Sequence, residues 1–232
     1  GLPAPAQRYL HFMRVLGRPR DRSFRVGLRG RFKLKPEAPW RPSEVWQYNT
    51  GPIVTRTFYM RLRVAGLPMI GRDTYREGHG LMVGRLLDRI TVLEGRGAEF
   101  DAAELVTYLN DLVLMAPTML LTPAVAWEPV DEGSFDLTLT DHGLCVRCRV
   151  YIAESGAPVD FATEDRFYYD AADPKHPVRT RWTTPIAGYQ EAGDRMLPTA
   201  ARAVWHLPSG ELSYGEFRPA LQTLAWNVGP GE

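Results

Sequence analysis

Apolar and polar residues alternate with a period of two along most of the chain. The pattern is clear within residues 24–34, 57–64 and 135–140, where Arg, Lys, Thr or Asp separate the apolar positions. Because successive side chains of a strand point to opposite faces, it predicts strands with one buried face. Turn-forming pairs such as Gly51-Pro52 and Ser209-Gly210 separate the runs, which favours an antiparallel meander. The predicted strands cover residues 24–34, 45–49, 57–64, 69–77, 79–87, 90–94, 123–130, 135–140, 146–152, 158–169, 178–184, 199–207 and 212–226.

One segment follows a helical period instead. Asp101 and Glu104 match a capping box, with Asp101 as the N-cap and Glu104 three residues into the helix. Apolar residues then recur at helical spacing as far as Pro117, which would end the helix. A short helical turn is expected at 118–121 and an N-terminal helix at about 4–15.

These elements predict a mainly β (α+β) fold in a single domain over residues 1–232. A sheet of about ten or more strands tends to curl. We therefore expect a single large curved antiparallel sheet or half-open β-barrel, closed by the mid-chain helix at about 101–115 lying against its concave face. No internal repeat or linker interrupts the chain.

Composition narrows the classes of partner. The 28 basic and 27 acidic residues give a formal net charge of +1, so no global field attracts nucleic acid or a membrane. Arginines alternate with tyrosine on the strands at 59–63 and 147–151, a pattern that could contact nucleic acid or acidic lipid. A solvated sheet face balanced by nearby acids is the simpler interpretation, and we expect no nucleic-acid partner.

Sequence motifs for cofactors and metals are missing. The chain has no Walker or Rossmann glycine pattern and no nucleophile elbow. Its histidines lack metal-ligand spacing to another His or Cys. Cys145 and Cys148 lie on a predicted strand, where positions i and i+3 face opposite ways, so they are expected to be structural. We predict no cofactor and no metal.

Membrane and targeting signals are also lacking. No run approaches the roughly 18 apolar residues of a membrane span, and residues 1–10 lack the apolar core of a secretion signal. The expectation is a cytoplasmic protein with no integral membrane span. The alternative is membrane attachment through a segment absent from this chain.

Several short motifs occur in a fixed order. They are Asp73-Thr-Tyr-Arg-Glu-Gly-His-Gly80, Tyr108-Leu-Asn-Asp followed by Ala116-Pro117, Asp165-Arg-Phe167, Trp182-Thr-Thr-Pro185, Trp205-His-Leu-Pro208 and Tyr214-Gly-Glu-Phe217. Together they resemble a family of uncharacterised bacterial proteins with "YLND…AP", "DRY", "W-S/T-T-P" and "WHLP…YGxF" strings. The resemblance spans nearly the whole chain. It implies a curved antiparallel sheet like that of bacterial lipoprotein carriers, and many relatives carry an N-terminal membrane segment.

Strand parity predicts which polar residues face inward. Asp73 and Tyr75 share a face with Met69, and Asp165 shares a face with Phe161. A carboxyl in an apolar pocket has a raised pKa unless a donor or cation partners it, which is how a general acid is made. Asp73, Tyr75 and Asp165 are therefore the candidate catalytic residues. The alternative is that the two acids accept structural hydrogen bonds or pair with an arginine and stabilise the sheet.

A second group is expected to touch a ligand. It consists of aromatic residues assigned to the concave face, a helix amide that could instead serve packing, and a histidine at a strand end that could instead be structural. The candidate ligand-binding residues are Trp46, Tyr48, Asn110, Tyr169, Trp182, Trp205 and His206.

Three functions remain open. The leading one is binding of a hydrophobic small molecule or lipid-like ligand in the concave cavity of the half-barrel. The second is a cofactor-independent enzyme of cyclase or isomerase type, acting on a hydrophobic natural-product-like substrate by acid–base catalysis. The third is a purely structural or membrane-associated module.

Overall fold

A computed structural model of the protein describes residues 1–170 and 173–229. Within these ranges two helices and a 3₁₀ turn accompany the strands: α1 (Ala4–Phe12), α2 (Ala98–Met115) and η1 (Pro117–Leu120). The first six strands are β1 (Ser23–Phe32), β2 (Arg41–Thr50), β3 (Thr55–Val64), β4 (Leu67–Arg76), β5 (His79–Leu86) and β6 (Ile90–Gly95). The strands after α2 are β7 (Val125–Asp131), β8 (Ser134–Asp141), β9 (Leu144–Ile152), β10 (Pro158–Thr163), β11 (Phe167–Asp170), β12 (Asp173–Arg179), β13 (Trp182–Thr183), β14 (Ile186–Ala192), β15 (Arg195–Leu207) and β16 (Gly210–Trp226).

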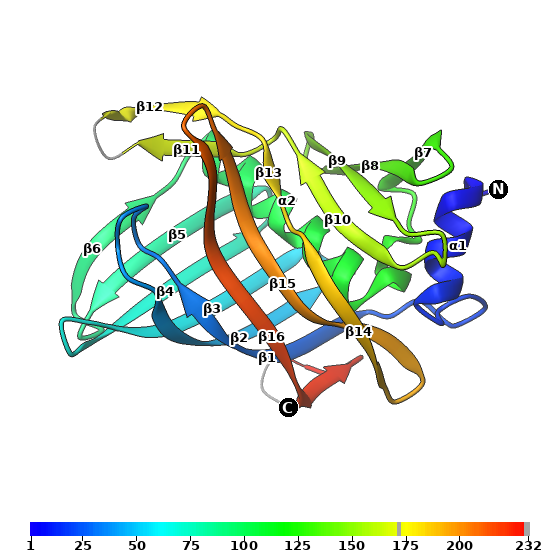
Figure 1. Cartoon of the computed structure of the whole chain (residues 1–232), viewed down its shortest axis with the longest axis horizontal. Helices are drawn as coiled ribbons and strands as arrows, with labels where there is room; N and C mark the ends of the chain where they lie inside the picture. The colour runs from blue at the N-terminus through cyan, green and yellow to red at the C-terminus, as the bar shows by residue number, and fades with distance from the viewer. Residues whose placement is uncertain (171–172, 230–232) are drawn as a thin grey trace.

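One large antiparallel sheet dominates the fold, and it is curved but not closed (Figure 1). Its strands follow the order β6-β5-β4-β3-β2-β1-β16-β15-β13-β10-β9-β8-β7, with β14 paired to β15 beside this path. The last strand, β16, pairs with the first, β1, and so joins the two halves of the meander. In the described part of the chain β6 and β7 remain as the two edges, so the predicted curved sheet is confirmed as an open one.

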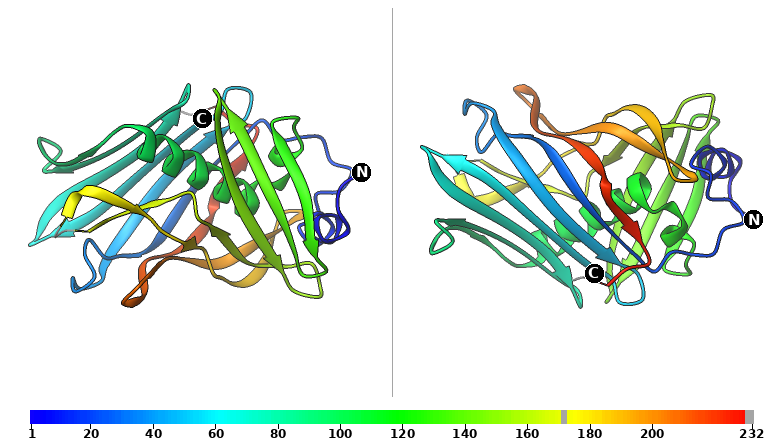
Figure 2. Two further views of the ribbon diagram at one scale, coloured as in Figure 1. Left: turned by 90° about the horizontal axis from the view of Figure 1, so that it is seen from above. Right: turned by 90° about the horizontal axis from the view of Figure 1, so that it is seen from below.

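Helix α2 lies in the hollow of this sheet. Figure 2 shows it running between strands β3–β6 on one side and strands β7–β10 on the other. Nearly every residue from Ala103 to Met115 is buried, so the helix is enclosed almost all round and does not merely cover an opening. A helix that is apolar on most of its circumference is typical of a core position.

The start of α2 differs from the capping-box prediction. The N-cap is Gly97, and Asp101 already lies in the first helical turn, where its Oδ1 accepts a hydrogen bond of 2.6 Å from the amide of Gly80. Glu104 does not reach back to the helix start but points into the protein interior, where its residue is 1% exposed. The pattern was misleading because both acids have partners on neighbouring strands.

The second half of the sheet and α1 complete the core. The Tyr9 hydroxyl donates a 2.9 Å hydrogen bond to the carbonyl oxygen of Val113 in α2, and its ring lies 5.5 Å from that of Phe135. No helix in the described ranges is both long and apolar enough to span a bilayer.

Two predicted strands are broken in the structure. The run at 158–169 bends at Glu164, so β10 and β11 belong to different sheets, and the run at 178–184 is divided between β12 and β13. Strand β14 lies in a region for which the sequence pattern predicted no strand.

The N-terminal end of α2 packs directly on the backbone of β5. A Cβ atom added at Gly80 would lie 2.2 Å from the carbonyl oxygen of Phe100, a backbone atom that cannot rotate away. Gly71 on β4 differs, because its added Cβ would meet its nearest atom, Met60 Cε, at 3.5 Å. Of these two glycines, only Gly80 is needed for the close approach of helix and strand.

We expect Gly80→Ala to lower the free energy of unfolding by about 1–3 kcal/mol, because the new methyl group would force α2 away from the sheet. Gly71→Ala is the matched control and should stay close to wild type. Urea denaturation followed by tryptophan fluorescence measures both. Equal stability of Gly80→Ala and wild type would contradict this close packing.

Candidate functional site

A cavity of about 220 Å³ lies between α2 and the concave face of the sheet. Most of its wall is apolar, and four of the seven methionines of the chain line it. Leu34 and Leu93 also line it and are 37% and 48% exposed, so the cavity reaches the surface beside these two residues. Other apolar lining residues are Leu28, Phe32, Phe58, Met60, Met69, Met82, Leu114, Met115 and Phe217.

Buried charges lie at and behind the polar part of the wall, where Arg56 and Asp111 line the cavity. Arg56 of β3 donates from Nε to Asp111 Oδ2 at 2.8 Å and from Nη1 to Glu104 Oε2 at 2.7 Å, both on α2. Asn49 of β2 donates a further hydrogen bond of 3.1 Å to Asp111 Oδ2. The Arg56 and Glu104 side chains are only 3% and 2% exposed. This arrangement fixes α2 to strands β2 and β3 through charge-assisted hydrogen bonds.

Asp73 of β4 and Arg166 extend this polar wall and also line the cavity. We call the five charged side chains the Arg56 cluster, whose members are Arg56, Asp73, Glu104, Asp111 and Arg166. Three carboxyl groups therefore lie near two guanidinium groups, and all of these residues except the half-buried Asp73 are buried.

Burial raises the proton affinity of two of these acids. Burial raises the pKa of the Asp73 carboxyl above its usual range, although the positive charges of Arg56 and Arg166 act in the opposite direction. Burial, reinforced by the negative charge of Asp73, raises the pKa of Glu104 to about 8. The site therefore favours the protonated form of these two carboxyl groups more than water does.

Arg166 stacks on aromatic rings, and no carboxylate of the described residues lies at hydrogen-bond distance from it. Its guanidinium carbon lies 4.5 Å from the ring centroid of Trp182 and 5.3 Å from that of Trp205. Trp182 donates from Nε1 to the Tyr214 hydroxyl at 3.0 Å, and Tyr214 in turn stacks on Trp205. This aromatic group, on β13, β15 and β16, forms the wall of the site near Arg166.

The structure places four predicted site residues at the cavity or directly behind it. Asp73, Asn110 and Trp182 line the cavity. Trp205 is buried behind them, against Arg166 and Tyr214.

Tyr75 and Tyr169 lie away from the cavity: Tyr75 is buried, whereas Tyr169 is half-buried. Tyr75 is fully buried as expected, yet its hydroxyl donates a 2.7 Å hydrogen bond to Asp141 at the turn between β8 and β9. The ring of Tyr169 stacks on Phe100 at 5.2 Å. Neither belongs to the cavity wall.

Asp165 does not point inward, and this expectation was wrong. It accepts hydrogen bonds from the amide of Arg147 at 2.7 Å and from the guanidinium group of Arg179, on the outer side of the sheet. The bend at Glu164 interrupts strand parity, so Arg166 takes the inward position. Asp73, Tyr75 and Asp165 therefore do not converge.

The aromatic face of β2 is the outer face, which corrects a second expectation. Trp46 is 47% exposed and packs against Tyr59, and Tyr48 donates through its hydroxyl to the carbonyl oxygen of Val228 at 3.3 Å. The inward positions are the alternate ones, which include Gln47 and Asn49. His206 lies on the face opposite Trp205, where its Nε2 is 2.9 Å from Thr183 Oγ1, and does not line the cavity.

Sequence reasoning missed three members of the Arg56 cluster: Arg56, Glu104 and Arg166. One signal was present, since Arg56 continues the parity of Phe58 and Met60, which the pattern assigned to the inner face. Glu104 and Asp111 are seven residues apart and so share a helix face, but the capping-box interpretation concealed this.

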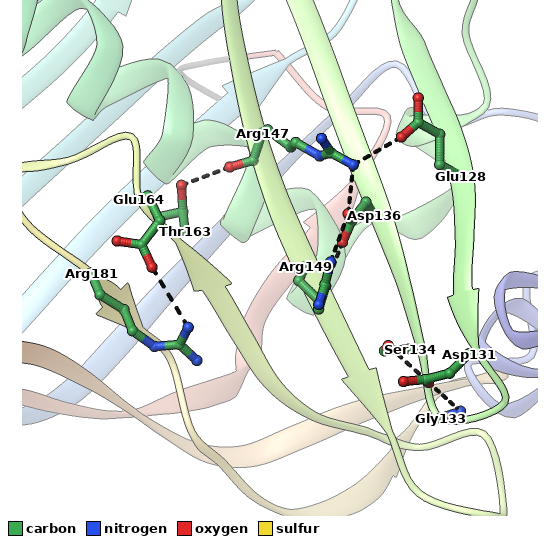
Figure 3. Close-up of polar contacts among 10 residues, drawn as sticks. All are labelled: Glu128, Asp131, Gly133, Ser134, Asp136, Arg147, Arg149, Thr163, Glu164 and Arg181. Carbon is green, nitrogen blue, oxygen red and sulfur yellow. Dashed lines mark hydrogen bonds and ion pairs between the residues drawn. The ribbon is translucent and has the colours of Figure 1, made fainter.

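On strands β8 and β9 the arginine-bearing outer face is balanced by acids, as expected. Figure 3 shows the buried Asp136 carboxylate between Arg147 and Arg149, with contacts of 2.7 and 2.8 Å. Arg147 also reaches Glu128 at 2.9 Å, and Arg181 lies 3.6 Å from Glu164. In the described ranges no group of three or more His, Cys, Asp or Glu side chains is arranged to hold a metal ion.

Comparison with known proteins identifies the family. The family of unknown function DUF6544 matches residues 1–217. The chain belongs to this family. No curated protein matches the chain.

Solved structures with a similar outline have very different sequences. A LolA superfamily protein from Nitrosomonas europaea is 14% identical, with a TM-score of 0.46 over 97% of this chain and 95% of that one. A DUF1329 family protein from Desulfovibrio piger is 13% identical, with a TM-score of 0.45 over 97% and 93% of the two chains.

The raised pKa of Glu104 makes stability depend on pH. Between about 4.5 and about 8 the native Glu104 keeps a proton that the unfolded chain releases, so the free energy of unfolding falls as the pH rises across this window. Glu104→Gln mimics the protonated side chain, and we expect it to reduce this slope by at most about 1.4 kcal/mol per pH unit. Urea denaturation at closely spaced pH values measures the slope.

Glu44→Gln is the control for this prediction, because it removes an exposed carboxylate that forms an ion pair with Arg61 on the outer face. It should leave the pH slope as in wild type. An unchanged slope in Glu104→Gln would show that the buried acid does not hold the proton.

Proposed function

We propose that the DUF6544 chain binds a hydrophobic small molecule or lipid-like ligand in the cavity beside α2. The observation that supports this proposal is the nature of the cavity wall. The wall is mainly apolar, rich in methionine and continuous with exposed leucines at the surface. Apolar pockets with a few fixed polar groups are typical of small-molecule sites. Methionine side chains adapt to ligands of irregular shape, which suits a flexible chain.

Binding is favoured over the acid–base enzyme by the positions of the candidate catalytic groups. Tyr75 is engaged with Asp141, and Asp165 is engaged on the outer face. Of the three, only Asp73 adjoins the cavity.

The direct test uses the neutral fluorophore N-phenyl-1-naphthylamine, which brightens in apolar surroundings. We expect its fluorescence to rise on mixing with the protein and to fall when a fatty compound displaces it. Native mass spectrometry of the protein as purified should detect a retained ligand. A protein that neither enhances the probe nor retains a ligand would overturn the proposal.

A cavity-filling variant locates the binding site. Ala201 lines the cavity, so Ala201→Phe would place a ring in the space that the ligand needs. We expect it to weaken probe binding by about tenfold or more, since the lost burial of a few methylene groups already amounts to more than 1.4 kcal/mol. Probe titration measures the dissociation constant.

Ala126→Phe is the matched control, because Ala126 is exposed on β7 and lies outside the cavity wall. Its probe affinity should equal that of wild type. Equal affinity in Ala201→Phe would place the binding site elsewhere.

A further inference from the structure

Charge is unevenly distributed over the chain. Residues 29–44, 61–72 and 83–91 together contain ten basic and three acidic residues, which gives these segments a formal charge of +7. Because the whole chain carries +1, the remaining residues carry −6. The near-neutral total therefore conceals a strongly basic part of the protein, whose local field can attract anions.

The three basic segments meet at one end of the sheet. Each consists of a connection between two paired strands, β1–β2, β3–β4 or β5–β6, and of the strand ends beside it. Consecutive strands of this meander are antiparallel neighbours, so alternate connections lie at the same end. Figure 2 shows this end on the side of the molecule away from α1. We call it the basic rim, and define it as residues 29–44, 61–72 and 83–91.

Cross-strand pairing brings arginines of the rim together on the outer face. Paired residues of neighbouring strands point to the same face of a sheet. From β1 to β5 the pairs form one row, which is Arg29, Glu44, Arg61, Ile70 and Arg85. Three guanidinium groups and one carboxylate therefore lie side by side on the outer face.

Most cations of the rim have no carboxylate partner. Among the described residues only two of the ten form ion pairs, Arg61 with Glu44 at 2.7 Å and Arg31 with Glu216 at 2.6 Å. None of the ten is buried. An outer hollow of about 770 Å³ beside the row has four arginines but one acid in its wall, together with Trp40. The rim is thus available to an anionic partner.

Exposed apolar side chains accompany these charges at the same turns. Leu34, Leu67, Leu87 and Ile90 belong to the rim and are exposed. Apolar side chains gathered on a surface in this way mark an interaction site. The ring of Trp40 lies 4.6 Å from the guanidinium carbon of Arg31, and tryptophan favours the boundary between lipid and water.

This combination of groups matches the layers of an anionic bilayer. Phosphate-bearing head groups attract lysine and arginine, and the boundary of the acyl chains accepts leucine and isoleucine. A nucleic-acid duplex would also attract the cations, but its phosphates would leave the exposed Leu67 and Leu87 in water. The rim therefore suits a lipid surface better than a nucleic acid.

We propose that the basic rim docks on the surface of a bilayer that contains anionic phospholipids. Leu34 belongs both to the rim and to the cavity wall, so docking would place the opening of the cavity at the lipid surface. The inference depends on the outer surface of the protein and does not require that the cavity binds a ligand.

Sedimentation of the full chain with vesicles tests the inference. One set of vesicles is pure phosphatidylcholine, and the other contains about one third phosphatidylserine. We expect binding to the anionic vesicles alone, and about tenfold weaker binding when salt is raised from about 0.05 to about 0.5 M, because the ions screen the attraction. Binding to neither set, or equal binding to both, would overturn the inference.

A double variant removes two charges of the rim. Lys35 and Arg89 are exposed and form no ion pair among the described residues. Each basic residue near an anionic surface contributes about fivefold to the affinity, so Lys35→Gln combined with Arg89→Gln should weaken vesicle binding about 25-fold.

Arg20→Gln combined with Arg22→Gln is the matched control. Both arginines are exposed and precede β1, at the opposite end of the sheet from the rim. This control should bind anionic vesicles as wild type does. An equal loss in the two double variants would show attraction without a defined docking surface and would refute the rim.

A second pair of variants tests the apolar contact. Ile90 of the rim and Ile53 of the β2–β3 turn are both 56% exposed, and they lie at opposite ends of the sheet. We expect Ile90→Ser to weaken vesicle binding about threefold or more, since part of its side chain leaves water on docking, and Ile53→Ser to have no effect. Equal binding of the two variants would overturn the lipid contact, and tighter binding of a short DNA duplex than of vesicles would then identify nucleic acid as the partner.

The two proposals fail independently. Ala201→Phe fills the cavity but leaves the rim intact, so it should bind anionic vesicles as wild type does. Loss of vesicle binding with a normal response of N-phenyl-1-naphthylamine would refute docking alone. Normal vesicle binding without any response of the probe would refute only the function proposed for the cavity.

Discussion

A guanidinium group buried between two acids fixes the position of the central helix. Arg56 on β3 bonds to Glu104 and Asp111, which lie on the same face of α2 and are separated by two turns. An apolar helix enclosed on nearly all sides could rotate or slide at little loss of apolar burial. Displacing α2 from Arg56 would leave buried charges unpaired, which is strongly unfavourable. We infer that this ion pair specifies the rotation and height of the helix, and with them the shape of the cavity.

The same constraint explains why the cavity is not uniformly apolar. Charged side chains in the interior hold α2 in place. Asp73 and Arg166 lie close to these charges and line the cavity. Because these acids are buried close to one another, the cluster favours a protonated carboxyl group. The polar end of the cavity is thus both a structural anchor and a chemically distinct surface toward any ligand.

Local periodicity was enough to predict most strands and the helix, since each depends on its own residues. It could not assign the inner face of β2. The aromatic residues Trp46 and Tyr48 look like core material, but Gln47 and Asn49 face inward because α2 brings Asp111 opposite them. That pairing joins residues 62 positions apart in the chain, and no pattern within β2 contains it. The sequence pattern did not predict the bend at Glu164 either. Because of this bend, Arg166 points inward in place of Asp165.

Arginine at position 166 suits its surroundings in a way that lysine would not. A planar guanidinium can stack against Trp182 and Trp205 while one N–H edge remains free, whereas a lysine ammonium is a compact, strongly hydrated charge. Stacking lets the cation be buried without a carboxylate at hydrogen-bond distance.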